Sequence, residues 1–220
     1  MSDIFTYIDS AISSADVPVL VEIGAARGED TCKMVDRIHT IKGTSDYEYY
    51  AFEPDPRNIA DIKNSRINHF ITLIPAAVGD YCKRTTFHQS GGTNPQFGYE
   101  HTLSGSLKRP VQHLQAHPWC KFEDKTEVRM MRLDSFFSSF SLDHIDFVWC
   151  DVQGAEDLVI AGAGDALKHT RYFYTEYYDT EMYQGQPSAA EIARRLGNDW
   201  RVVQQWQYDI LFENICPKTK

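Results

Sequence analysis

A glycine-containing turn directly after an apolar run is the first segment suited to binding a ligand. Residues 17–23 form this near-continuous apolar run. Gly24 lets the backbone turn sharply and approach a ligand, and Gly28 lets a helix start close to the strand. Glu22 places a carboxylate near the end of the run, where burial is costly unless polar partners surround it. Because doubly wound sheets bind ligands at the carboxyl ends of their strands, this turn is predicted to line a ligand site.

An acidic residue follows the second apolar segment at a distance typical of nucleotide-binding folds. Glu53 directly follows residues 47–52, a predicted strand, and lies 25 residues after Gly28. In nucleotide folds the corresponding acid lies about 20 residues beyond the glycine turn. A carboxylate is an acceptor-only group that can take two donors. The two segments together predict a nucleotide-like cofactor.

The turn differs from two common phosphate-binding motifs. A dinucleotide turn of the form Gly-x-Gly-x-x-Gly needs glycine where this chain has Ala26 and Glu29. The chain also has no Gly-x-x-x-x-Gly-Lys-Ser/Thr loop. An NAD-dependent oxidoreductase on a similar sheet is therefore kept only as an alternative.

Apolar and amphipathic segments alternate along most of the chain, which favours βαβ units on a parallel sheet. The last two apolar segments flank Tyr208-Asp209 and are predicted to pair as a closing hairpin. The predicted strands span residues 17–23, 47–52, 70–78, 128–133, 145–150, 171–177, 201–206 and 210–215. The predicted helices span residues 1–16, 30–41, 56–64, 154–167 and 188–196, with a short one after Asp134.

Residues 81–125 interrupt this alternation. They contain several Gly and Pro residues and few apolar runs, and a stretch of this length without regular structure is usually functional. We expect an insertion with short strands that crosses the top of the sheet. The chain has no internal repeat or linker, so residues 1–220 are predicted to form one domain.

Composition and charge restrict the classes of partner. The chain has 220 residues with a net charge of −9 and no block of Lys or Arg, which disfavours nucleic acid. No apolar run approaches the roughly 20 residues that span a bilayer, and residues 1–16 lack the basic start of a signal peptide. The five cysteines are scattered without Cys-x-x-Cys spacing, which indicates free thiols in a reducing compartment. A cytoplasmic protein without nucleic-acid or membrane partners is expected.

Several short motifs occur in an order that points to one family. Residues 22–28 have the spacing Glu-x-Gly-x-x-x-Gly, and residues 146–156 read Asp-Phe-Val-Trp-Cys-Asp-Val-Gln-Gly-Ala-Glu. With them the chain resembles FkbM-type, class I S-adenosylmethionine (SAM) methyltransferases, in which an apolar strand ends in Asp-x-Glu-Gly-x-Glu. Gln153 departs from this pattern, because the family usually has Glu there. Further matches are residues 52–55, 76–80, 104–107 and 133–136, so the resemblance covers roughly residues 17–180.

The resemblance implies an α/β, Rossmann-like fold: a doubly wound, mostly parallel seven-stranded sheet whose final strand is antiparallel. It implies that the glycine turn carries the methionine part of SAM and that Glu53 accepts hydrogen bonds from both ribose hydroxyls. The product would be S-adenosylhomocysteine. The residues expected to bind the cofactor are Glu22, Gly24, Ala25, Arg27, Gly28, Glu53, Pro54, Ala77, Val78, Ser106, Asp151 and Gln153.

Methyl transfer is an in-line displacement in which positioning supplies much of the rate, and a hydroxyl nucleophile gains from a base that accepts its proton. Asp151 is the first candidate, because it ends the strand predicted over residues 145–150, where the crevice opens. An acid there could also hold the SAM ammonium or a divalent ion. His101 is the second candidate, since an unperturbed imidazole has a pKa of about 6.5. Glu156 and Glu176 are reserve acids, and the tyrosines that could wall a ring-shaped acceptor are Tyr174, Tyr177, Tyr178 and Tyr183.

The expected function is transfer of a methyl group to a hydroxyl of a small molecule or glycan, and the family resemblance implies the preference for oxygen. A non-catalytic SAM-binding protein on the same fold is the other alternative. No metal site is predicted: His113 and His117 are four residues apart, but Pro118 follows directly and no third ligand is near in sequence.

Overall fold

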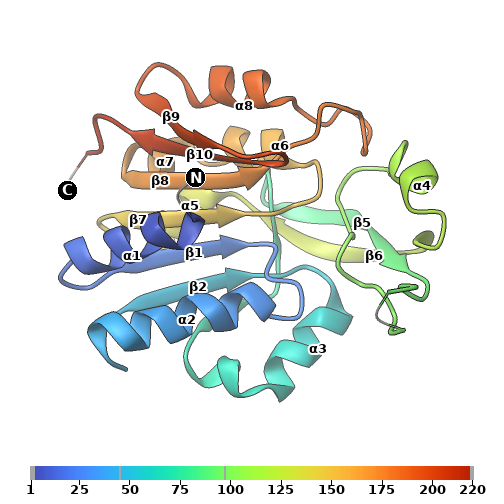
Figure 1. The fold of residues 1–220 in the computed structure, drawn as a ribbon, viewed down its shortest axis with the longest axis horizontal. Helices are drawn as coiled ribbons and strands as arrows, with labels where there is room; N and C mark the ends of the chain where they lie inside the picture. Colours follow the sequence, from blue (N-terminus) through green and yellow to red (C-terminus); the bar gives the residue numbers. More distant parts are fainter. Residues whose placement is uncertain (1–2, 45, 97, 219–220) are drawn as a thin grey trace.

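Seven strands form the central sheet in the order β3-β2-β1-β7-β8-β10-β9 (Figure 1). The computed structural model describes residues 3–44, 46–96 and 98–218. Neighbouring strands are parallel except where β10 pairs with β8 and with β9. The predicted doubly wound sheet with an antiparallel final strand is confirmed. Its strands are β1 (Val19–Ile23), β2 (Glu48–Phe52), β3 (Thr72–Ile74), β7 (Ile145–Cys150), β8 (Thr170–Glu176), β9 (Trp200–Gln205) and β10 (Asp209–Asn214).

Helices cover both faces of this sheet, which explains why every residue of β1 is buried. On one face, α1 (Ile4–Ser14) and α2 (Glu29–Lys42) pack against Leu20 and Phe147. On the other face, Val148 and Phe173 pack against the remaining core helices. Those helices are α5 (Leu133–Ser139), α6 (Glu156–Ala161), α7 (Gly164–Lys168) and α8 (Ala189–Leu196), while α3 (Pro56–Asn64) and the short 3₁₀ helix η1 (Arg66–His69) connect β2 to β3.

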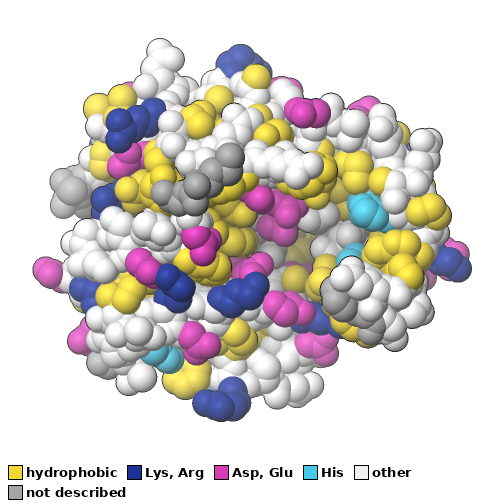
Figure 2. All heavy atoms as spheres, in the orientation of Figure 1, with side chains coloured by type: hydrophobic (Ala, Val, Ile, Leu, Met, Phe, Trp, Pro, Cys, Tyr) yellow, Lys and Arg dark blue, Asp and Glu magenta, His cyan; other side chains and the backbone are white. Residues whose placement is uncertain are grey.

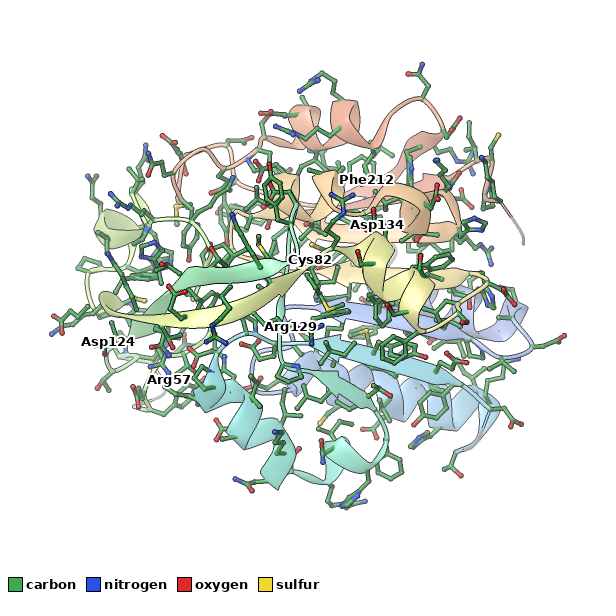
Figure 3. The ribbon with its side chains drawn as sticks, turned by 180° about the vertical axis from the view of Figure 1, so that it is seen from behind. Arg57, Cys82, Asp124, Arg129, Asp134 and Phe212 are labelled. Carbon is green, nitrogen blue, oxygen red and sulfur yellow. The ribbon has the colours of Figure 1, made fainter. Side chains whose placement is uncertain are left out.

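A second, three-stranded sheet lies beside the carboxyl ends of the central strands (Figures 1 and 3). It consists of β4 (Ala77–Val78), β6 (Lys121–Met131) and β5 (Lys83–Gly91), in that spatial order. The segment predicted as an insertion with short strands therefore contains one nine-residue strand and much of an eleven-residue one. Most of these two strands was not predicted, because they contain few apolar residues and form no apolar runs; only residues 128–131 of β6 fall within the strand predicted over residues 128–133. Residues 92–120 connect them and include the four-residue helix α4 (His113–Ala116).

Two predicted elements are divided in the structure. The strand predicted over residues 70–78 is split into β3 and β4, because the chain turns at Pro75 and β4 pairs instead with Met130 and Met131 of β6. The helix predicted over residues 154–167 is split into α6 and α7 at Gly162. There the backbone passes so close to residue 79 that a Cβ on Gly162 would lie 1.9 Å from the Gly79 carbonyl oxygen.

This contact gives a test of the packing between α6 and the second sheet. Gly162 has an ordinary φ of −91°, so Gly162→Ala adds a steric clash without backbone strain. We expect it to lower the free energy of unfolding by about 1–3 kcal/mol, the usual cost of overpacking, as measured by urea denaturation. Gly91→Ala is the control, because no atom lies within 4 Å of its added Cβ. Equal stability of the two variants would show that the close approach is absent.

Candidate functional site

A cavity of about 290 Å³ opens at the carboxyl ends of β1, β2 and β7. It is visible as a hollow with acidic side chains beside it and histidines toward the second sheet (Figure 2). Nine of the twelve residues expected to bind a cofactor line this first cavity: Glu22, Gly24, Ala25, Glu53, Pro54, Ala77, Val78, Asp151 and Gln153. The tertiary structure thus brings most of the predicted site residues together around one cavity.

The glycine turn holds β1 against β7. Gly24 has a φ of +92°, and a Cβ at this position would lie 1.8 Å from the Asp151 carbonyl oxygen. The Asp151 amide donates to the Ile23 carbonyl at 2.9 Å. Gly24 is therefore required for the close approach of two strand ends, in addition to the ligand approach expected from the sequence. Gly28, with a φ of +89°, is the N-cap of α2.

Glu53 ties the turn after β1 to the segment after β2. Its Oε2 accepts the Ala26 amide at 2.8 Å, and its Oε1 accepts the Asp55 amide at 2.7 Å. Asn58 donates a longer hydrogen bond of 3.4 Å to Oε1. Burial raises the pKa of Glu53 to about 8, and these donors oppose the shift. An ionised carboxylate has about four acceptor positions, so acceptor capacity is left for a ligand hydroxyl.

Glu22 is a buried acid with one satisfied oxygen. Its Oε2 accepts the Thr31 hydroxyl at 2.6 Å and the Tyr49 hydroxyl at 2.8 Å. Its Oε1 accepts no hydrogen bond from the part of the chain that the structure describes, and the residue lines the first cavity. Burial raises the pKa of Glu22 to about 7. The arrangement leaves an acceptor for a cationic or N–H group of a ligand.

A second cavity, of about 250 Å³, adjoins the first. The two share Leu103, Asp151 and Gln153 among their lining residues. Asp151 therefore lies at the junction of the two spaces, which suits either of the roles expected for it. The remaining lining residues of the second cavity are Asn94, His101, Ser104, His113, His117, Trp119, Glu176, Tyr178, Met182 and Tyr183.

Gln153 links the acids at this junction. Its Nε2 donates to Asp151 Oδ1 at 2.7 Å and to Glu176 Oε2 at 3.3 Å, while its Oε1 lies 3.1 Å from the Tyr183 hydroxyl. Burial raises the pKa of Asp151 to about 6 and also raises that of Glu176. A glutamate at position 153 would add a third carboxylate to this cluster, whereas the amide supplies a donor to both acids.

His101 faces the second cavity with one satisfied ring nitrogen. Its Nε2 lies 2.7 Å from the Ser104 hydroxyl, and its buried Nδ1 has no hydrogen-bond partner. The ring packs edge-on against Trp119 at a centroid distance of 4.9 Å. Burial lowers the pKa of His101. The lowered pKa favours the neutral form of the imidazole, which is the form that can accept a proton.

Three expected cofactor residues do not line the first cavity. Two of them, Arg27 and Ser106, form hydrogen bonds with residues that do line it. Arg27 donates to the Thr102 hydroxyl at 3.0 Å and to the Glu100 carbonyl at 2.6 Å, which anchors this segment of the insertion. Ser106 donates to the Gln153 carbonyl at 2.8 Å. Gly28 shapes the start of α2, as described above.

Several lining residues on α2 and in the insertion were missed from the sequence. All of them except Gly105 and Leu107, which belong to the matched residues 104–107, lack a motif. The missed residues are Glu29, Asp30, Lys33, Phe87, Tyr99, Thr102, Leu103, Gly105 and Leu107. Of the four tyrosines expected to wall an acceptor, Tyr178 and Tyr183 line the second cavity. His113 and His117 lie close together, with ring centroids 4.9 Å apart. Within residues 3–44, 46–96 and 98–218, no group of three or more His, Cys, Asp or Glu side chains could hold a metal ion.

Residues 22–210 match the family described as the methyltransferase FkbM domain. The chain is 37% identical to the 2-O-methyltransferase NoeI of Sinorhizobium fredii over 170 aligned residues. The aligned segment covers 77% of this chain and 67% of that protein. Solved structures with TM-scores of 0.47 include an rRNA methylase from Streptococcus thermophilus (10% identity, 98% of both chains) and a precorrin-6y C5,15-methyltransferase from Geobacter metallireducens (11% identity, 94% of this chain and 87% of that one).

The fold is that of a class I methyltransferase, and the family match covers most of the chain. The chain belongs to the FkbM methyltransferase family, as its motifs predicted. The family and the relative named as an O-methyltransferase confirm the expected enzyme class and support O-methylation. None of the helices within the described ranges has the length and apolar character needed to cross a membrane.

The raised pKa values of the buried acids predict a pH-dependent stability. Folding raises the pKa of Glu22 from 4.5 to about 7 and that of Asp151 from 3.8 to about 6. Between these limits the folded ligand-free protein binds more protons than the unfolded chain, so its free energy of unfolding should fall as pH rises. Urea denaturation at several pH values from about 4.5 to about 8 measures this decline.

Glu22→Gln separates the contribution of Glu22 to this pH dependence of stability from the contribution of general repulsion among the acidic side chains. The amide oxygen can still accept from Thr31 and Tyr49, but the group no longer titrates. We expect a shallower decline, by up to about 3 kcal/mol across the range, because one pKa unit corresponds to roughly 1.4 kcal/mol. A variant whose stability declines as steeply as that of the parent would contradict the raised pKa of Glu22.

Proposed function

We propose that the protein transfers the methyl group of SAM to a hydroxyl of a small molecule or glycan. The observation that carries this proposal is the junction of two cavities at Asp151, Gln153 and Leu103. One cavity would hold the methyl donor and the other the acceptor, so that the reacting atoms meet beside a carboxylate. The named 2-O-methyltransferase relative supports oxygen as the atom that is methylated.

The charge of the first cavity favours SAM over a dinucleotide. Five acids line it, namely Glu22, Glu29, Asp30, Glu53 and Asp151, against one cation, Lys33. Lys33 is paired with Asp30 at 2.7 Å. SAM has a sulfonium and an ammonium group, which such a lining attracts, whereas the pyrophosphate of NAD would be repelled. The residues present therefore fit SAM, and the NAD-dependent alternative is disfavoured.

Each part of SAM has residues suited to it. The free Oε1 of Glu22 and the backbone of the turn at Gly24–Ala25 would hold the methionine part. Glu53, which keeps acceptor capacity, would take the ribose hydroxyls. Phe52, Ala77, Val78, Phe87 and Leu107 supply the apolar part of the lining that would contact the adenine.

The second cavity has the side chains that a hydroxylated ring requires. Amide, hydroxyl and imidazole groups alternate there with the aromatic faces of Trp119 and Tyr178. Tyr178 also packs against Tyr208 at a centroid distance of 5.3 Å, which extends the aromatic surface to the β9–β10 turn. Polar groups that fix hydroxyls and aromatic faces that cover a ring are the usual elements of a small-molecule site. A small molecule or glycan, and no nucleic acid, is the proposed acceptor.

SAM supplies an electrophilic methyl group attached to a good leaving group. Asp151 would accept the proton of the acceptor hydroxyl as the oxygen–carbon bond forms and the carbon–sulfur bond breaks. Gln153 keeps Asp151 in place through its 2.7 Å hydrogen bond. His101 is the second candidate base, because burial lowers its pKa and it lines the same cavity. The products are the methyl ether and S-adenosylhomocysteine.

Cofactor binding is tested by isothermal titration of the protein with SAM and with S-adenosylhomocysteine. Glu53→Ala removes the proposed ribose acceptor and should weaken SAM by about 1.5–3 kcal/mol, the range for hydrogen bonds to charged groups. Glu123→Ala, an exposed acid remote from the cavity, is the control and should bind like the parent. Folded protein that gives no heat with either ligand would refute SAM as the cofactor, and unchanged affinity of Glu53→Ala would exclude Glu53 from the site.

The base is identified by comparing Asp151→Asn with His101→Gln. With a hydroxylated acceptor found by screening, release of S-adenosylhomocysteine should fall about 100-fold or more in Asp151→Asn, because a general base typically contributes 10²–10⁴-fold. His101→Gln should reduce the rate less than about tenfold. The opposite order would assign the proton transfer to His101, and loss of SAM binding in Asp151→Asn would show a cofactor-binding role instead.

A further inference from the structure

A third space lies outside both cavities and shares no lining residue with either. This outer groove has a volume of about 580 Å³ and lies between β6 and the segment that contains α4. Segment 113–120 forms a common wall, because His113, His117 and Trp119 face the second cavity whereas Leu114, Pro118 and Cys120 face the groove. The groove is lined by His88, Arg109, Pro110, Leu114, Pro118, Cys120, Lys121, Phe122, Glu123 and Lys125.

The charge of the outer groove is opposite to that of the rest of the protein. Arg109, Lys121 and Lys125 line it together with one acid, Glu123. Lys121 and Glu123 are 3.8 Å apart and well exposed, so their mutual attraction is weak. Arg109 and Lys125 have no ion-pair partner in the part of the chain that the structure describes. Within a protein of net charge −9, this is a local concentration of uncompensated positive charge.

A buried polar side chain without a partner contributes to the same groove. His88 is 8% exposed and lies opposite Lys125 in the β5–β6 ladder. No described residue forms a hydrogen bond with its ring, which lines the groove, so the ring nitrogens are accessible to a ligand there. Burial and the positive charges of Lys125 and Arg109 lower the pKa of His88. The ring therefore provides an unused hydrogen-bond donor among cations.

We propose that the outer groove binds a phosphate or sulfate group of a small molecule. An oxyanion would accept hydrogen bonds from the Arg109 guanidinium, the Lys125 ammonium and the His88 ring, and would compensate the charges that the protein leaves unpaired. The groove is larger than a single oxyanion, and Phe122, Leu114 and the two prolines provide apolar surface for the neutral body attached to it. Three cations on an acidic protein suit a small anion better than a polyanion, which the net charge would repel.

The pKa of the His88 imidazole is the most direct measure of anion binding in the outer groove. In NMR titrations of the full chain with inorganic pyrophosphate, we expect the pKa of His88 to rise, because a bound anion stabilises the imidazolium. Affinity for sulfate, whose own charge is constant across the neutral pH range, should accordingly increase as pH falls, and His88→Gln should abolish that pH dependence. The other titratable groups that line the groove are Glu123, the Cys120 thiol, Arg109, Lys121 and Lys125. A pH dependence that persists in His88→Gln would assign it to one of these groups and contradict the role of His88.

Calorimetric titration with pyrophosphate and with sulfate measures the affinity. Arg109→Gln and Lys125→Gln should each weaken binding at least about fivefold, since each removes a charge-assisted hydrogen bond. Lys63→Gln, an equal charge change at an exposed position on α3, is the matched control and should bind like the parent. Equal weakening by all three variants, or an unchanged pKa of His88 at saturation, would overturn the proposal in favour of nonspecific attraction.

Two further experiments distinguish a soluble ligand from a lipid headgroup and from RNA as the source of the oxyanion. Pyrophosphate binding without co-sedimentation on vesicles of phosphatidylcholine and phosphatidic acid would support a soluble ligand. Sedimentation that depends on Arg109 and Lys125 and is not displaced by pyrophosphate would overturn it. So would binding of a labelled single-stranded RNA that Lys125→Gln weakens and pyrophosphate does not displace.

Discussion

The contact between Gly24 and the backbone of Asp151 is the constraint on which the site depends. Only a residue without a Cβ can occupy position 24, because that atom would lie 1.8 Å from the Asp151 carbonyl oxygen. The approach brings the turn after β1 next to the end of β7. It therefore brings the cofactor side, with Glu22 and Glu53, to the same place as the acid at the junction of the two cavities. The glycine at position 24 therefore has a steric origin.

The protein concentrates buried acids where it is expected to bind a cationic cofactor, and the one cation among the described lining residues, Lys33, is paired with Asp30. Glu22 and Asp151 have raised pKa values because burial disfavours the charged form. Hydrogen bonds from neutral groups compensate part of this cost, most clearly where Gln153 donates to Asp151 and Glu176. A bound cation would compensate the remainder. The outer groove has the reverse arrangement, with unpaired cations around His88.

The central sheet could be predicted from the sequence because its inner strands are buried on both faces. Val19–Ile23 and Ile145–Cys150 are therefore near-continuous apolar runs, which can be recognised directly in the sequence. The second sheet could not be predicted in this way, since residues such as Lys125 and Glu127 on its exposed face interrupt the apolar pattern of β6. Gly162 illustrates a different limit: it divides a predicted helix because of a contact with Gly79, which is 83 positions earlier in the chain.

The sequence by itself determined the fold class, the family and nine of the residues that line the first cavity, because these depend on local turns, apolar runs and motifs contiguous in the chain. Only the tertiary structure decided which residues of the insertion face that cavity, that Asp151 lies between two spaces, and that Arg27 and Ser106 support the site from behind. Those relations join residues tens of positions apart, such as Arg27 with Thr102 and Ser106 with Gln153. They arise from how the second sheet packs on the first, and no local pattern in the sequence encodes that packing.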